Sequence, residues 1–278
     1  MSERMNIWDI LSNKQLNVEQ EYVNLWNLVT SNNQVTISQN YRTYSYSLYQ
    51  VINEHFIEFK NRGTFIKFDE LLNYLELRIP DDYNPLYMEV TLDTLDLVME
   101  IILLVFSELD DLDYGYHYED IKNSIYQNIE LILQKSNQKV IEIEKGKLII
   151  VPNDETVTAV TEIILPDDEK LALSILGYSH YANKDNIESK RHILLKLSNY
   201  IEPKLKMKKD SDISFVLNKY FIRHGDKENQ ENVKNLGNEK LNQLYDGLYR
   251  DILFYLLGQE HENFASTVKQ LKESISGK

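Results

Sequence analysis

One long apolar segment, which runs from Met88 to Leu109, constrains the fold most. When this segment is wound as a helix, apolar side chains occupy most of its sides, whereas a helix on the surface of a domain carries a single apolar stripe. A helix of this kind must be covered by other elements. Residues 88–109 therefore predict a central, buried helix around which the rest of the chain packs.

The composition indicates that the covering elements are also helices. Nine glycines and five prolines are few for 278 residues, and the chain is rich in Leu, Ile, Glu, Lys and Asn. The hydrophobic fraction of 42% and the charged fraction of 27% are those of a globular protein rather than a disordered one. We therefore expect an all-α, mainly helical fold with short connections.

Helical periodicity and helix-end signals place the other helices. In the first half they are expected over Asn17–Val29, Tyr44–Lys60, Phe68–Leu77 and Tyr118–Leu133, with an acidic break at Asp110–Asp113. In the second half, helices are expected to begin at Pro152–Glu155, at Pro166–Glu169 and at a capping pair of Asp185 with Glu188. The third of these stops before Pro203, and the last long helix, Leu236–Leu257, is followed by a separate amphipathic piece, Asn263–Ile275.

One segment departs from the helical pattern. Two runs rich in β-branched residues, VIEIE and KLIIV, flank Lys145 and Gly146, which is the signal of a β-hairpin over residues 139–151. Two strands alone are only marginally stable, so this hairpin must pack on helices. It also marks the expected boundary between an N-terminal helical region, residues 1–136, and a second domain, residues 137–278, in which the hairpin precedes a C-terminal helical part.

Charge and residue usage argue against several classes of function. The chain has no cysteine, so disulfides, thiolate metal sites and cysteine nucleophiles are excluded. A formal net charge of -14 argues against broad, non-specific binding of nucleic acid. The first residues lack the apolar core of a signal peptide, and the longest apolar run, Ile101–Phe106, is too short to span a bilayer. We expect a soluble, cytoplasmic protein with no membrane partner.

Neither a metal nor an organic cofactor is predicted. His180 and His192 lie near several aspartates in the sequence, but the chain has no HExxH motif and no paired histidines at ligand spacing. The sequence also has no P-loop, no dinucleotide-binding fingerprint and no G-x-S-x-G elbow.

The strongest chemical candidate is a segment that ends in Asn218, Arg223, His224 and Asp226. An apolar run leads to Arg223, so the sequence predicts these polar groups at the end of a buried helix. Cleavage of RNA without a metal needs a base for the ribose 2′-hydroxyl and a cation for the developing phosphate charge, and histidine and arginine suit these tasks. The alternative is structural: Arg223 pairs with an acidic neighbour such as Asp226, and His224 caps the helix.

A resemblance to a known family lies in the same region. The segments LSNYIEPKLK (Leu197–Lys206), FVLNKYFIRHGD (Phe215–Asp226) and LNQLYDGLYRDILFYLL (Leu241–Leu257) resemble bacterial abortive-infection proteins of the HEPN class (higher eukaryote and prokaryote nucleotide-binding). Over residues 167–258 the resemblance implies a bundle of four to five helices, frequently dimeric, with the polar motif facing the dimer cleft. Active members are metal-independent ribonucleases in phage defence or in toxin–antitoxin pairs.

The resemblance implies a role for each polar residue if the chain is a metal-independent endoribonuclease. His224 would be the general base, Arg223 the phosphate clamp and Asn218 an orienting group. Lysines would steer the RNA, namely Lys219, Lys227 and, from the cationic run Lys204–Lys209, Lys208 and Lys209. The alternative is that this run is a solvated connector that does not bind RNA.

The spacing of the motif leaves a second hypothesis open. The usual HEPN pattern has an arginine first and a histidine after four to six intervening residues, whereas Arg223 and His224 are adjacent and Asn218 stands six positions before the histidine. The second hypothesis is a non-catalytic HEPN-like subunit that dimerises, senses or binds a partner, and in which the cluster is structural. The expected partners are a second copy of the chain, an RNA substrate and a partner or antitoxin protein.

Overall fold

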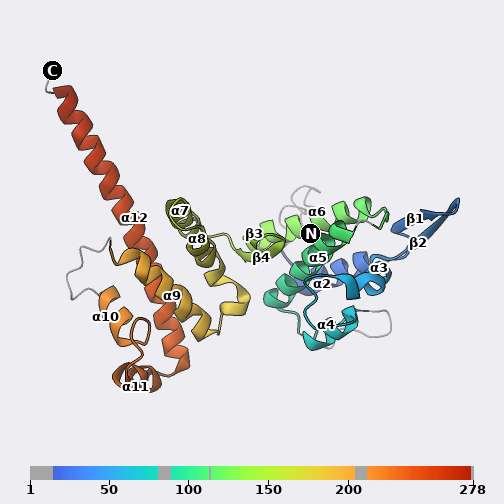
Figure 1. Cartoon of the computed structure of the whole chain (residues 1–278), viewed down its shortest axis with the longest axis horizontal. Helices are drawn as coiled ribbons and strands as arrows, with labels where there is room; N and C mark the ends of the chain where they lie inside the picture. Colours follow the sequence, from blue (N-terminus) through green and yellow to red (C-terminus); the bar gives the residue numbers. More distant parts are fainter. Residues whose placement is uncertain (1–14, 81–88, 113, 204–211, 277–278) are drawn as a thin grey trace, which may run out of the picture. The chain divides into compact units, whose positions relative to one another are not determined.

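The described residues fold into helices and two small antiparallel hairpins (Figure 1). The computed structural model describes residues 15–80, 89–112, 114–203 and 212–276. Two compact units divide the chain, residues 1–150 and 151–278, and each is described by itself. The expected mainly helical class is confirmed.

Helix α5 (Leu92–Leu112) is the centre of the first unit. Buried residues occupy consecutive positions, such as Ile101, Ile102 and Leu103, so more than one face of the helix is covered. The prediction of a central buried helix is confirmed over the described residues. The elements that share its core are α2 (Val18–Thr30), α3 (Leu48–His55), the 3-10 turn η1 (Phe56–Glu58), α4 (Phe68–Tyr74) and α6 (Glu119–Ser136).

The expected acidic break after residue 109 is wrong, because Asp110 and Asp111 belong to α5. Carboxylates near the carboxyl end of a helix are repelled by the partial negative charge of that end. Two lysines offset this effect: the Lys122 Nζ atom lies 2.7 Å from Asp110 Oδ2, and the Lys60 Nζ atom lies 2.7 Å from Asp111 Oδ2. The helix therefore continues for another turn.

A β-hairpin replaces the start of the helix expected over Tyr44–Lys60. Strands β1 (Val35–Gln39) and β2 (Arg42–Tyr46) pair in antiparallel register, with Val35 opposite Tyr46. The two residues between them, Asn40 and Tyr41, both have left-handed backbone conformations, with φ angles of 52° and 63°, as a tight two-residue hairpin turn requires. Helix α3 begins only after Ser47, which forms a capping box with Gln50.

The hairpin expected over residues 139–151 is confirmed as β3 (Gln138–Glu144) and β4 (Lys147–Pro152). Gly146 supplies the left-handed turn conformation, with φ of 77°. The hairpin packs with the first unit: Ile150 is buried in its core, and the Ile150 N–H donates to Glu100 Oε1 at 2.7 Å. The boundary between the units therefore falls after Ile150, whereas the sequence places it before residue 137.

After the last two residues of β4, the described elements of the second unit are all helices. Its elements are α7 (Glu155–Ile164), α8 (Glu169–Leu176), the 3-10 turns η2 (Gly177–Ser179) and η3 (Tyr181–Asn183), α9 (Ile187–Ile201), α10 (Asp212–Lys219), α11 (Lys227–Leu236) and α12 (Asn238–Ser276). Asp154 and Asp168 cap α7 and α8 as their positions predict. The cap of α9 is Asn186 rather than the expected Asp185.

Three helices in the second unit differ from those that the sequence predicts. Helix α10 ends at Lys219 instead of reaching Gly225, and α11 forms from a polar stretch that carries little apolar periodicity. The two pieces expected over Leu236–Leu257 and Asn263–Ile275 are one continuous helix, α12, because Gly258 does not interrupt it. One internal glycine costs a helix only about 1 kcal/mol.

Candidate functional site around Arg223 and His224

Arg223, His224 and Asp226 lie on the connection between α10 and α11, which we call the Arg–His segment (Tyr220–Asp226), and Asn218 lies on the last turn of α10. The helix expected to carry them has already ended, because Phe221 adopts a left-handed backbone conformation with φ of 61°. The Arg223 N–H donates to Leu217 O at 3.1 Å, so the chain turns back on the last turn of α10. Other elements therefore determine where these polar side chains point.

Two side chains from other helices hold the start of the Arg–His segment. The Tyr245 hydroxyl on α12 donates to Tyr220 O at 2.9 Å. Burial raises the pKa of Tyr245 to about 12, so the phenol keeps the proton that it donates. On α9, the Arg191 guanidinium lies 4.7 Å from the centre of the Phe221 ring, and Arg191 Nη1 donates to Phe221 O at 3.3 Å. These contacts hold the two residues at the left-handed turn, Tyr220 and Phe221, in place.

Asn229, at the start of α11, organises the rest of the segment. Its side chain is buried, and its Nδ2 atom donates to Asn218 O at 2.9 Å and to His224 O at 3.1 Å. Its backbone N–H donates at 2.8 Å to Oδ1 of Asp226, the N-cap of α11. Sequence reasoning missed Asn229, although the spacing of three residues from an aspartate cap was a usable signal.

The Arg223 side chain is directed to α9 and is 13% exposed. Its Nε atom donates to Ser198 Oγ, its Nη2 atom donates to Ser198 O at 3.3 Å, and its Nη1 atom lies 3.6 Å from Glu202 Oε1. Ser198 is itself fully buried. Arg223 thus joins the Arg–His segment to the last turn of α9. Its acidic partner is Glu202 rather than Asp226, which caps α11 instead.

The other two candidate catalytic side chains do not join Arg223. The His224 imidazole is exposed, and no hydrogen bond or ion pair connects it to the described residues. The Asn218 Nδ2 atom donates to Ser214 Oγ, one turn back along α10, at 3.3 Å. Arg223, His224 and Asn218 are therefore close in sequence, but they do not form a hydrogen-bonded catalytic constellation within the described chain.

The lysines expected to steer RNA also differ in their surroundings. The Lys219 Nζ atom lies 2.7 Å from Glu228 Oε1, and the hydrogen bond from this carboxylate raises the pKa of Lys219. Lys227 opens α11 and is exposed. Lys208 and Lys209 lie outside the described residues. Of the two lysines that the structure describes, Lys219 is therefore already paired within the chain.

A second polar cluster, which sequence reasoning missed, joins α9 to α12. The Lys190 ammonium is buried, with its Nζ atom 2.7 Å from both Asp246 Oδ1 and Asn242 Oδ1. The Tyr178 hydroxyl donates to the same Asp246 oxygen at 3.0 Å, and burial together with the Asp246 charge raises the pKa of Tyr178 far above its usual value. Since each group has a partner, the cluster is a satisfied interhelical contact.

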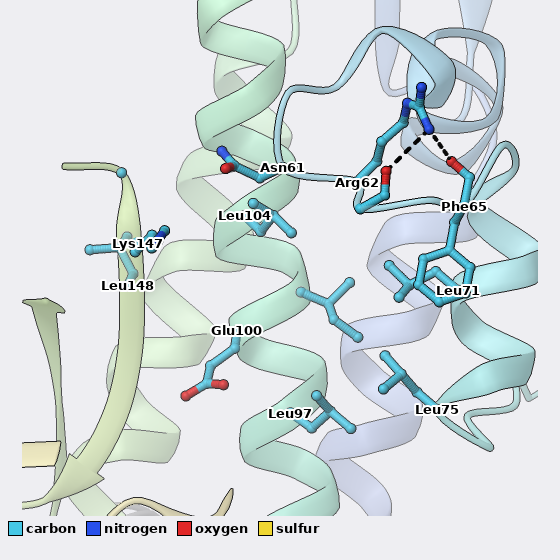
Figure 2. A pocket seen from close by; sticks show the side chains of 13 residues that line it. Asn61, Arg62, Phe65, Leu71, Leu75, Leu97, Glu100, Leu104, Lys147 and Leu148 are labelled. Atoms are coloured by element: carbon cyan, nitrogen blue, oxygen red, sulfur yellow. Dashed lines mark hydrogen bonds between the residues drawn. The ribbon is translucent and has the colours of Figure 1, made fainter. Parts of the chain in front are cut away.

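The first unit contains a pocket of about 440 Å³ between α4, α5 and β4 (Figure 2). Figure 2 shows Leu97 and Leu104 of α5 facing Leu71 of α4 and Leu75 just after it, with Leu148 of β4 on the other side. Four residues with polar side chains also belong to the lining: Asn61, Arg62, Glu100 and Lys147. This is the composition of a small-molecule pocket, an apolar interior with a few polar groups.

Buried Glu108 holds the loop that forms one wall of this pocket. Its carboxylate accepts hydrogen bonds from the N–H groups of Lys60 at 2.7 Å and Asn61 at 2.9 Å, and from Asn61 Nδ2 at 2.6 Å. The next residue, Arg62, donates to Phe65 O at 2.7 Å and closes the loop on itself. The wall is therefore fixed by contacts within the unit.

Comparisons with protein-family models, with curated proteins and with solved structures found no match. Within the described residues, no three histidine, aspartate or glutamate side chains are grouped so as to hold a metal ion. None of the described helices is both long enough and apolar enough to cross a membrane.

Proposed function

We propose that this chain is a HEPN-like protein of phage defence that acts by sensing or by binding a partner, and not as a ribonuclease. The resemblance of Leu197–Lys206, Phe215–Asp226 and Leu241–Leu257 to abortive-infection proteins supports the class. All three segments fall in the second unit, whose described elements after β4 are helices, in keeping with the helical bundle that the resemblance implies.

The contacts of Arg223 support a non-catalytic role more than any other observation. An arginine that clamps phosphate must present its planar fork to the ligand. The Arg223 nitrogens instead face Ser198 and Glu202 within the same chain. A phosphate group could bind the Arg223 guanidinium only by displacing these contacts. Asn218 stands where the usual HEPN pattern has its arginine, and its neutral amide supplies no cation for the phosphate. The exposed imidazole of His224 is then left without its catalytic partner.

RNA integrity tests this proposal. Purified wild-type protein and His224→Ala, each incubated with total bacterial RNA in excess EDTA, are expected to leave the RNA intact, and induction of either is expected to leave growth unchanged. His224→Ala should fold normally because the imidazole is exposed. Fragmentation of RNA by the wild type that the folded variant loses would replace the proposal with the ribonuclease hypothesis.

The pocket in the first unit supports the sensing form of the proposal. Its volume of 440 Å³ lies within the range of about 300–1,000 Å³ that small-molecule sites occupy. Its interior is lined by leucine side chains and suits a small apolar ligand. The cationic side chains of the lining are already engaged within the chain, since Arg62 donates to the carbonyl groups of Ile57 and Phe65 and Lys147 Nζ lies 2.5 Å from Glu144 Oε2. A fatty acid is a simple probe of the apolar interior.

Titration with a fluorescent fatty acid checks the pocket. The wild type is expected to bind the probe saturably, with one site per chain, and Leu104→Trp is expected to abolish binding by filling the pocket. Leu131→Trp, at an exposed position on α6, is the matched control and should bind as the wild type does. Equal binding by both variants would contradict a ligand site in this pocket.

A further inference from the structure

From Phe254 to its end, α12 carries large apolar side chains on its surface. Phe254, Phe264, Leu271 and Ile275 are 60%, 66%, 57% and 74% exposed. Figure 1 shows this part of α12 (red) extending beyond the other helices of the second unit. The first half of the helix instead buries side chains such as Leu241, Tyr245 and Ile252 in the core. This exposed part therefore has an apolar face without a covering element among the described residues of its unit.

The spacing of these residues identifies the kind of element that would cover them. They belong to a row at alternating intervals of three and four, which we call the seam: Phe254, Leu257, His261, Phe264, Val268, Leu271 and Ile275. The mean interval of 3.5 residues is that of a coiled coil, in which a seam packs against the seam of another helix. The pattern extends over three heptads.

A second copy of this chain supplies a helix with the matching seam. In heptad notation, the a positions include β-branched Val268 and Ile275, and the d positions include Leu257 and Leu271. In parallel coiled coils, β-branched residues at a with leucine at d favour two strands over three or four, and phenylalanine occupies the remaining apolar positions, Phe254 at a and Phe264 at d. His261, also at an a position, would meet its own copy, and a single polar residue at a fixes the register of such pairs.

The flanking charges permit this parallel arrangement. A g residue of one helix faces the e residue five positions later in its partner. Glu260 would thus face Ala265, and Thr267 would face Lys272, so these two flanking pairs bring no like charges together. The flanking positions therefore add no like-charge repulsion to the pairing of two copies.

The area of the seam is sufficient for a specific interface. From the exposed fractions, its side chains offer roughly 500 Å² per helix, or about 1,000 Å² for the pair, the lower limit of specific protein interfaces. We propose that two copies of this chain associate through a parallel coiled coil formed by residues 254–275 of α12. This interface does not depend on the proposed function, because a nuclease and a non-catalytic subunit could both use it.

Sedimentation equilibrium across a concentration series tests the interface. The full-length wild type is expected to be a dimer at micromolar concentrations, and Phe264→Asp and Leu271→Asp are expected to be monomers with unchanged helix content. Ser266→Asp, at an exposed position on the opposite face, is the matched control and should remain dimeric. His261→Ile should tighten the dimer by about tenfold or more, because it replaces the polar layer with an apolar one. A monomeric wild type would overturn the proposal, even if its apolar face were then found to bind lipid vesicles instead of a second copy. Dimers that persist in both aspartate variants would also overturn it.

The orientation has a test of its own, because the chain has no native cysteine. In a parallel pair in register, His261→Cys places the two thiols at one layer, close enough for a disulfide. Mild oxidation is expected to cross-link this variant completely, whereas Ser266→Cys should not cross-link. Absence of the cross-link in a dimeric His261→Cys protein would overturn the parallel arrangement.

Discussion

Replacing Asn229 with aspartate is expected to lower the free energy of unfolding of the second unit by about 3 kcal/mol. The side chain is 2% exposed, and its amide nitrogen donates to Asn218 O and His224 O. Aspartate has nearly the same shape but presents an oxygen to both carbonyl groups. The variant would therefore lose two hydrogen bonds and gain a buried repulsion.

Urea unfolding followed by far-UV circular dichroism measures this loss, and hydrogen exchange of residues 218–229 locates it. Gln230→Glu is the matched control, because Gln230 is an exposed neighbour whose amide also donates to a carbonyl group, Gly225 O, at 2.9 Å. The control should change the unfolding free energy by less than about 0.5 kcal/mol. Equal effects of the two changes would show that Asn229 does not organise the segment.

Replacing Glu108 with alanine is expected to lower the free energy of unfolding of the first unit by about 3–5 kcal/mol. Glu108 is 3% exposed, and its carboxylate is the acceptor for the N–H groups of Lys60 and Asn61. Alanine would leave these groups without an acceptor and open a cavity beside α5. The pocket wall that begins at Asn61 should loosen in the same variant.

Fluorescence of Trp26, which is buried in the core of the first unit, reports this unfolding transition in urea when Trp8, the other tryptophan of the chain, is replaced by Phe in every variant compared. Glu108→Gln keeps one acceptor oxygen and should lie between the wild type and Glu108→Ala. Asp111→Ala, on the exposed next turn of α5, should leave the midpoint unchanged because its ion pair with Lys60 is solvated. A midpoint for Glu108→Ala equal to that of Asp111→Ala would contradict this role of Glu108.

The elements that the sequence predicted well are those with strong local signals. Apolar periodicity gave the central helix α5, and Lys145 with Gly146 gave the β3–β4 hairpin. The β1–β2 hairpin was missed because its turn residues, Asn40 and Tyr41, do not include the glycine that usually marks such a turn. Helix α11 was missed because its sequence, KENQENVKNL, is mostly polar.

The candidate site was predictable in its residues but not in its contacts. Arg223 and His224 were recognisable as a chemical pair, yet their surroundings come from distant positions. Ser198 lies 25 residues before Arg223, and Tyr245 lies 25 residues after Tyr220. No local pattern encodes such contacts, because they depend on how α9, α11 and α12 pack together. The sequence therefore could not decide between a catalytic and a structural arginine.

The central claim is that Arg223 has a structural role, in which its side chain is held by α9. A double-mutant cycle between Arg223 and Ser198 tests this claim most directly. The free energy of unfolding is measured by urea for the wild type, Arg223→Ala, Ser198→Ala and the double variant. The contact of the guanidinium with the buried hydroxyl predicts a coupling free energy of about 1–2 kcal/mol. A coupling of zero, with additive single changes, would mean that Arg223 is free to bind another group and would contradict this account.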